Sequence, residues 1–413
     1  MERRDRTVAA VAEETHAQTD RALRAHGPPG GRAAVTEPAG ELRGRLVLAD
    51  RVIAGRIRLD GDTIAAVELE GDDGPGSEAL PYLAPGFVDV HVHGWGGHDA
   101  MGSIDDLDGM ARALLLHGVT SFLPTGVTNP FPVLHAFADR VRAWLPAAPA
   151  NGAAPLGFNI EGPFISAARK GAHNPSFLAV PAEVPWSEIE PLVEGLRVVT
   201  IAPEIPGGLE LIGRLHGLGV RVSIGHSAAD LAAALAGYDA GGSSTTHLFN
   251  AMTGLEHRNP GLAAAALTRD DVYVELIADG QHVHPSLWPI AWRTKPAGRL
   301  MLVSDALALA GTGEGRMTIG GLEVDVKGDR CVLADGSGTL AGSVIALDTA
   351  VRNLVRHGAS LPAACAAAGA NPLAMLGVTD RGRIAVGQRA DLVELDAELN
   401  VRRVMRAGRF VEV

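Results

Sequence analysis

Histidines and carboxylic acids recur at the ends of apolar segments in this 413-residue sequence. Six segments end in such residues: His91 with His93, Glu161, His226, His247, Asp279 and Asp305. His91 and His93 are two positions apart, so on a β-strand both imidazoles point to the same side. Two imidazoles and a carboxylate are a common ligand set for Zn²⁺, Fe²⁺ or Mn²⁺. A divalent ion held in this way polarises a carbonyl group and lowers the pKa of water to about 7, which suits hydrolysis.

Each of these residues alone is a weak indicator of a metal site. A single histidine at a strand end is more often a hydrogen-bonded structural residue, and Asp305 is equally typical of a helix N-cap. The hypothesis of a metal site depends on several residues of the right type reaching one edge of one sheet. It therefore depends on the elements that carry them.

Eight apolar segments suit buried strands: residues 87–94, 119–126, 156–163, 197–204, 221–227, 244–250, 273–280 and 299–306. Ala- and Leu-rich stretches suited to helices, such as 105–117 and 228–236, separate most of them. This alternation predicts a parallel sheet, and eight units favour a (β/α)8 barrel, whose chemistry lies at the carboxyl ends of the strands. A doubly wound open sheet is the alternative, but no GxGxxG fingerprint follows a strand.

Both ends of the chain contain short strand-like runs with turn signals between them, such as 51–59 and 63–70 near the start and 401–405 and 409–413 near the end. We expect residues 41–84 and 378–413 to form one small β-sandwich domain beside a metal-dependent catalytic barrel at 85–377. Residues 1–40 carry few large apolar side chains and a Gly/Pro run at 27–31, which predicts a poorly ordered N-terminal extension.

Composition narrows the class of protein. Hydrophobic residues make up 46% of the chain, and 36 Lys and Arg against 48 Asp and Glu give a net charge of −12. An acidic surface disfavours nucleic acid and anionic membranes as partners. No run approaches the roughly 18 apolar residues of a membrane span, and no signal-peptide pattern begins the chain. Two cysteines without CxxC spacing fit a reducing compartment, so we expect a cytoplasmic protein.

Longer motifs surround the candidate ligands. They are PGFVDVHVHG at 85–94, NIEGPF at 159–164, KGAHNP at 170–175, HLFNAM at 247–252 and GRIAVGQRADLV at 382–393. With them, residues from about 42 to 413 resemble the amidohydrolase superfamily and, within it, the N-acetylglucosamine-6-phosphate deacetylases. The His-x-His pair and Ala-Asp-Leu-Val occur across the superfamily, whereas EGPF, KGAHNP and HLFNAM together are much more specific to the deacetylases.

This resemblance implies hydrolysis of the acetamide of N-acetyl-D-glucosamine 6-phosphate to D-glucosamine 6-phosphate and acetate, in amino-sugar catabolism. It implies one or two divalent ions per subunit (Zn, Fe, Mn or Co). Glu161, His226 and His247 would hold the principal ion, and His91 and His93 would hold a second ion bridged through Glu161.

The resemblance also assigns roles around the metal. Asp305 would be the general base and acid, and His173 would polarise the acetyl carbonyl. The expected substrate-binding residues are Ala172, His173, Asn250, Ala251, Arg258, Asp279, His282, Leu340, Ala341 and Gly342. In the family the arginine often reaches across a dimer interface, so we expect a homodimer that binds a small phosphosugar. From the sequence alone, Arg258 is equally typical of a solvated loop.

Two other functions remain open. Another amidohydrolase, acting on a different amide or cyclic amide or as a deaminase, would share the metal ligands but would not need Arg258 and His282. A catalytically silent barrel that binds a sugar phosphate or holds a structural metal is the third reading. Asp305 argues against the silent barrel, because a structural metal site needs no spare carboxylate.

Overall fold

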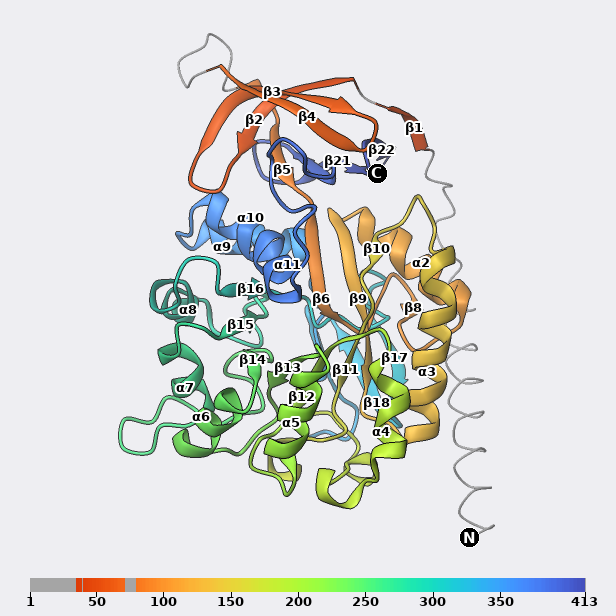
Figure 1. Cartoon of the computed structure of the whole chain (residues 1–413), viewed down its shortest axis with the longest axis vertical. Coiled ribbons are helices and arrows are strands. Elements are labelled where there is room, and N and C mark those ends of the chain that lie inside the picture. The colour runs from red at the N-terminus through yellow and green to blue at the C-terminus, as the bar shows by residue number, and fades with distance from the viewer. Residues whose placement is uncertain (1–34, 39, 71–78, 413) are drawn as a thin grey trace.

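A barrel of eight parallel strands occupies the middle of the molecule (Figure 1). The computed structural model describes residues 35–38, 40–70 and 79–412. In chain order the barrel strands are β6 (Phe87–Val92), β9 (Val119–Val127), β11 (Phe158–Glu161), β12 (Leu196–Ile201), β13 (Arg221–Ile224), β14 (Gly242–Thr245), β15 (Tyr273–Leu276) and β16 (Leu300–Leu302). The segment after β16 meets β6, since the Asp305 amide donates to the His91 carbonyl at 2.8 Å. The predicted (β/α)8 barrel is confirmed.

Helices cover the outside of the barrel. They are α2 (Ile104–Leu115), α3 (Phe131–Trp144), α4 (Trp186–Val193), α5 (Gly208–Gly217), α6 (Leu231–Asp239), α7 (Leu262–Thr268), α8 (Trp288–Thr294), α9 (Leu347–Arg356), α10 (Leu361–Ala368) and α11 (Ala370–Leu376). Helix α2 shows why they form. Ser103 and Asp106 make a reciprocal capping box at its start, and Leu107, Met110 and Leu114 repeat at helical spacing and are buried.

A second sheet combines the two ends of the described chain. Its strands, in sheet order, are β1 (Val35–Pro38), β22 (Arg409–Glu412), β21 (Val401–Arg406), β20 (Leu392–Leu395), β5 (Tyr82–Pro85), β2 (Glu41–Val47), β3 (Val52–Asp60) and β4 (Thr63–Leu69). Leu46, Ile57 and Leu83 share one hydrophobic core with Leu392 and Met405. A small β domain is thus built from both chain ends, with one hydrogen-bonded sheet around its core.

Strand β1 falls within the segment expected to be a poorly ordered extension. It pairs antiparallel with β22. Residues 1–34 lie outside the described residues, so the expectation for them stays a prediction, as does the exact division into domains.

A three-stranded antiparallel sheet is inserted between β16 and α9, and the sequence analysis did not anticipate it. It consists of β17 (Gly315–Ile319), β18 (Leu322–Lys327) and β19 (Arg330–Leu333). Its core includes Met317 and Val324 packed with Leu307, which follows β16. At the β17–β18 turn Gly320 has φ 54°, and a Cβ there would lie 3.3 Å from the Thr128 carbonyl oxygen. The turn therefore sits directly against the end of β9.

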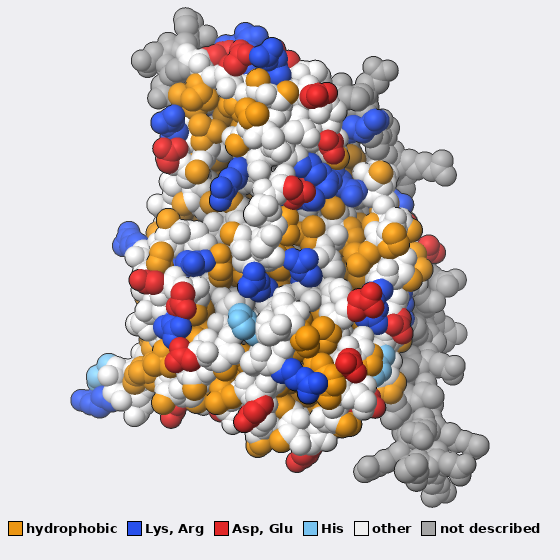
Figure 2. All heavy atoms as spheres, viewed as in Figure 1, with side chains coloured by type: hydrophobic (Ala, Val, Ile, Leu, Met, Phe, Trp, Pro, Cys, Tyr) orange, Lys and Arg blue, Asp and Glu red, His pale blue; other side chains and the backbone are white. Residues whose placement is uncertain are grey.

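The surface carries charges of both signs. Figure 2 shows acidic and basic side chains interspersed over the face seen in Figure 1. In the described part of the chain, no helix combines the length and apolar character needed to span a bilayer.

Candidate active site

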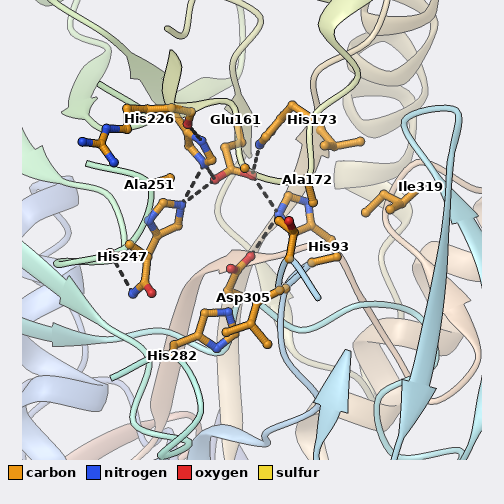
Figure 3. A pocket seen from close by; sticks show the side chains of 18 of the residues that line it. His93, Glu161, Ala172, His173, His226, His247, Ala251, His282, Asp305 and Ile319 are labelled. Atoms are coloured by element: carbon orange, nitrogen blue, oxygen red, sulfur yellow. Dashed lines mark hydrogen bonds and ion pairs between the residues drawn. The ribbon is translucent and has the colours of Figure 1, made fainter. Parts of the chain in front are cut away.

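The ionisable residues at the strand ends converge at one end of the barrel (Figure 3). Glu161 is the last residue of β11, and His226, His247 and Asp305 follow closely after β13, β14 and β16. The backbones of His226, His247 and Asp305 are left-handed, with φ of 47°, 27° and 51°. This conformation is uncommon outside glycine, and residues held in it cluster at functional sites.

Three ligand atoms form a first group. His226 Nε2, His247 Nε2 and Glu161 Oε1 lie 3.0 Å from one another, and all three residues are buried. The ligands of a tetrahedral zinc ion, each about 2.0–2.2 Å from the metal, lie roughly 3.3 Å apart. The donor set and its spacing therefore fit a divalent ion.

A second group shares Glu161 with the first. His93 Nε2 lies 3.3 Å from Glu161 Oε2 and 3.2 Å from Asp305 Oδ1, and His91 Nε2 lies 3.5 Å from a carboxylate oxygen of each. His91 Nε2 is fully buried and has no hydrogen-bond partner among the described residues. A buried ring nitrogen left in this state, facing two carboxylates, fits a ligand to a second ion bridged by Glu161.

The charges of the cluster depend on one another. Burial alone would raise the pKa of Glu161, but His91, His173 and His226 hold it well below its usual value. Burial likewise opposes ionisation of Asp305, yet His91 and His93 lower its pKa to about 2. Both carboxyl groups are therefore anionic near neutral pH and available as metal ligands or proton acceptors.

Glu275, a site residue that the sequence analysis missed, lies behind the cluster. Its Oε2 is 3.0 Å from His91 Nδ1 and accepts the His247 amide at 3.1 Å. An acceptor at Nδ1 places the proton there and leaves Nε2 free to bind a metal. The signal in the sequence was an acidic residue in the middle of a buried strand, β15, which is rare without a partner.

His173 reaches the cluster from the loop after β11. Its Nδ1 is 2.7 Å from Thr128 Oγ1, and its Nε2 is 3.2 Å from Glu161 Oε2. Figure 3 shows His173 beside Glu161 on the same side of the cluster as Ala172. The imidazole is buried and fixed from behind by Thr128, so its Nε2 is held toward Glu161 and the pocket.

A pocket of about 340 Å³ opens onto the metal-ligand cluster. Many of the predicted site residues line it: His93, Glu161, Ala172, His173, His226, His247, Asn250, Ala251, His282, Asp305, Leu340, Ala341 and Gly342. Others that line it were not predicted, among them Val127, Arg169, Leu307, Ile319 and Thr339. Thr339 directly precedes the predicted residues 340–342, whereas the others belong to no recognised motif. Ile319 lies on β17, which follows the last barrel strand in the sequence.

Three predicted residues lie elsewhere. His91 sits behind the pocket surface, within the ligand cluster. Asp279 orients His282, whose Nδ1 is 2.7 Å from Asp279 Oδ2. Arg258 lies in the exposed segment 254–259, in the loop before α7, and does not line the pocket of its own chain. Its expected role therefore stays a prediction.

The model of the amidohydrolase family matches residues 82–411, which is most of the chain. The chain belongs to the amidohydrolase family. This amidohydrolase is 40% identical over 335 residues to an N-acetylgalactosamine-6-phosphate deacetylase of Escherichia coli O157:H7, covering 79% of this chain and 87% of that one. It is 37% identical over 384 residues to the human N-acetylglucosamine-6-phosphate deacetylase, covering 89% and 92%.

Solved structures agree with this membership. The amidohydrolase superposes on the N-acetylglucosamine-6-phosphate deacetylase of Thermotoga maritima with a TM-score of 0.81 and 34% identity, covering 90% of this chain and 99% of that one. For a point mutant of the Mycobacterium smegmatis enzyme in complex with N-acetyl-D-glucosamine-6-phosphate, the TM-score is 0.83 at 32% identity, covering 93% and 100%.

Proposed function

We propose that this amidohydrolase is a metal-dependent deacetylase that converts N-acetyl-D-glucosamine 6-phosphate to D-glucosamine 6-phosphate and acetate, in amino-sugar catabolism. The observation that carries the proposal is Asp305, an anionic carboxylate beside the histidine and glutamate ligands in a pocket large enough for a monosaccharide. The named relatives, which match over most of both chains, support the same reaction.

The chain's own residues divide the chemistry among them. Glu161, His226 and His247, with His91 and His93, would hold one or two divalent ions of Zn, Fe, Mn or Co. A bound ion polarises the amide carbonyl and makes water more acidic. Asp305 accepts a proton from the attacking water and returns it to the departing amine, while His173 donates to the carbonyl oxygen. Proton transfer of this kind contributes about 10²–10⁴-fold to the rate.

The phosphate requires cationic or amide donors at the far end of the pocket. Arg169, Asn250 and His282 line the pocket in the same chain and offer such donors. We infer that Arg258 completes the phosphate site from the second subunit of a homodimer. The inference rests on the exposure of segment 254–259, where Leu255 is 52% exposed, and on the bidentate fit of arginine to phosphate.

The first test measures acetate release from N-acetylglucosamine 6-phosphate and from unphosphorylated N-acetylglucosamine, on protein with a counted metal content. We expect fast release from the phosphorylated sugar alone, and its loss on chelation. Folded, metal-loaded protein that releases no acetate would refute the deacetylase and favour another amide as substrate.

A second candidate substrate is N-acetylgalactosamine 6-phosphate, because the 40% identical relative carries the name of that deacetylase. The two sugars differ only in the orientation of the hydroxyl group at C4. Measuring kcat/KM for both, in the same assay, decides which epimer the site prefers.

The dimer is tested by mixing two inactive variants. In a hybrid of Arg258→Ala and Asp305→Asn subunits, one pocket contains Asp305 from the first subunit and Arg258 from the second. Recovery of activity on mixing supports an arginine shared across the interface. Activity that stays absent in a proven heterodimer, or a monomer in sedimentation, contradicts it.

The proposal includes a cytoplasmic location. Cys331 and Cys365 are both buried free thiols, as expected for a reducing compartment. Fractionation of cells expressing the tagged chain tests this location directly.

A further inference from the structure

The two sides of the pocket differ in polarity. Asn250, whose amide donates to the His247 carbonyl at 3.2 Å, lines the pocket together with Ala251, His282 and Arg169. Val127, Ala172, Leu307 and Ile319 also line it, and their side chains are hydrocarbon. Figure 3 shows Ile319 and Ala172 on the side of His93, across the ligand cluster from His247 and Ala251.

The apolar side of the pocket is a wall of packed hydrocarbon side chains. Ile319 is the last residue of β17, and it packs with Ala172 against the cluster that contains Leu307 and Met317. A Cβ added at the following Gly320 would lie 3.3 Å from the Thr128 carbonyl oxygen and 3.5 Å from Val127 Cγ1, so the turn lies close to the end of β9. The inserted sheet thus positions one side chain, Ile319, in the pocket lining on the side of His93.

The chemistry of an amide decides what this wall faces. The carbonyl carbon must lie between the metal ligands and Asp305, and because this carbon is trigonal, its nitrogen and its acyl carbon diverge from each other. If the sugar nitrogen and the phosphate occupy the polar side, the acyl group points to the apolar side. The side chains of this wall offer an acyl chain hydrocarbon contacts and no polar partner.

We propose that Val127, Leu307 and Ile319 form an acyl subsite, and that Ile319 limits the acyl group to acetyl. This proposal rests on the proposed function, since it assigns the orientation of that substrate. One methylene in an apolar pocket changes kcat/KM by about 10- to 200-fold. The chain therefore selects its substrate by acyl length as well as by phosphate.

The test compares N-acetyl- and N-propionyl-glucosamine 6-phosphate on the metal-loaded enzyme. For Ile319→Ala we expect the propionyl-to-acetyl ratio of kcat/KM to rise about tenfold or more, and for Ile319→Val by less. Thr318→Ala is the matched control, because Thr318 is adjacent on the same strand, opposite Glu323, and does not line the pocket. Thr318→Ala should leave the ratio unchanged.

Hydrolysis of the acetyl substrate by the wild-type enzyme tests the proposed function separately from the acyl subsite. Absence of that hydrolysis refutes the proposed function. If acetyl hydrolysis is present, an unchanged ratio in Ile319→Ala overturns the acyl subsite. An equal loss on both substrates also overturns it, since that would place Ile319 against the sugar. If Ile319→Ala does not fold, Ile319→Val and Val127→Ala decide the question by the same ratio.

Discussion

Two groups of charged side chains in this molecule contain the same chemistry in opposite settings. In the small β domain, Glu70 accepts from Arg43 at 2.8 Å and from Arg56 at 2.6 Å on an exposed face. At the end of the barrel, Glu161 and Asp305 are buried among histidines, and the structure shows no Lys or Arg ion-paired with either among the described residues.

This difference in setting distinguishes charged side chains that form ordinary surface ion pairs from charged side chains that belong to the candidate active site. The exposed carboxylate has its fixed cations and could be removed at little cost, because solvent screens such pairs. The buried carboxylates have only titratable rings around them, and Asp305 also has a left-handed backbone with φ 51°. Burying charges in this way is costly unless a cation compensates them, so the barrel cluster is compatible with a divalent metal site.

Among the substitutions that test this difference between buried and exposed charges, Asp305→Asn should have the largest effect. We expect kcat to fall by about 10²–10⁴-fold, because the amide cannot accept the proton. The principal ion should remain, since Glu161, His226 and His247 are intact. Steady-state kinetics with metal analysis checks this, and Asp335→Asn, at an exposed position, is the control. Near-normal turnover would remove Asp305 from the mechanism.

The Glu275→Gln substitution tests whether Glu275 orients His91 within the buried cluster. Loss of the charge behind His91 should weaken metal binding about 10- to 100-fold, as seen for residues that orient metal ligands. Metal content after dialysis against graded chelator measures the effect independently of turnover. Glu394→Gln is the matched control, because Glu394 is also a buried glutamate but lies in the β domain, paired with Arg403. Equal metal retention in both variants would contradict the role.

Asp348 is an intermediate case, buried but paired with His117 at 3.3 Å and Arg352 at 2.8 Å. Burial opposes its ionisation, yet His117 and Arg352 lower its pKa overall. A lowered folded pKa stabilises the protein above the unfolded value of about 3.9, and this stability is lost as pH falls through the folded pKa. Asp348→Asn should cost about 1–3 kcal/mol at pH 6.

That cost should shrink as the pH falls from about 3.9 to the folded pKa, because the unfolded carboxyl group takes up its proton first and the folded one follows. Urea denaturation of the metal-free wild type and the metal-free variant, at pH 6 and again below pH 4, measures this difference in the free energy of unfolding. A difference in stability that is independent of pH would show that packing, not charge, is responsible.

The smallest effect is expected for Glu70→Gln. Its two arginines lower the pKa of Glu70 to about 2, but the pair is exposed to solvent and salt. We expect no resolvable change in Tm at 1 M salt. A fall of several degrees that persists at that salt concentration would mean that the exposed cluster is structural after all.

The sequence alone predicted the barrel and the cluster of histidines and acids at its strand ends, because strand and helix patterns alternate and the same residue types recur at the strand ends. His91 and His93 are recognisable by their two-residue spacing. Residue patterns that recur in a sequence, or that form a known motif, can be recognised before the structure is known.

The rest depends on contacts distant in sequence. Glu275 looks like a lone acid within an apolar run until the fold brings His91 to it. Ile319 is an ordinary strand residue whose meaning comes from the inserted sheet and its turn against β9. Arg258 remains undecided because, in the proposed function, its partner atoms belong to another chain.

The pairing of β5 with β20 has a consequence for synthesis of the protein. Tyr82 lies opposite Leu395, so the whole barrel sequence leaves the ribosome before this edge of β5 can be covered. An uncovered strand edge recruits other strands, and larger proteins are aggregation-prone while such edges are open. Chains interrupted before residue 392 would therefore contain all the predicted metal ligands, while the edge of β5 that pairs with β20 would stay unpaired and prone to aggregation.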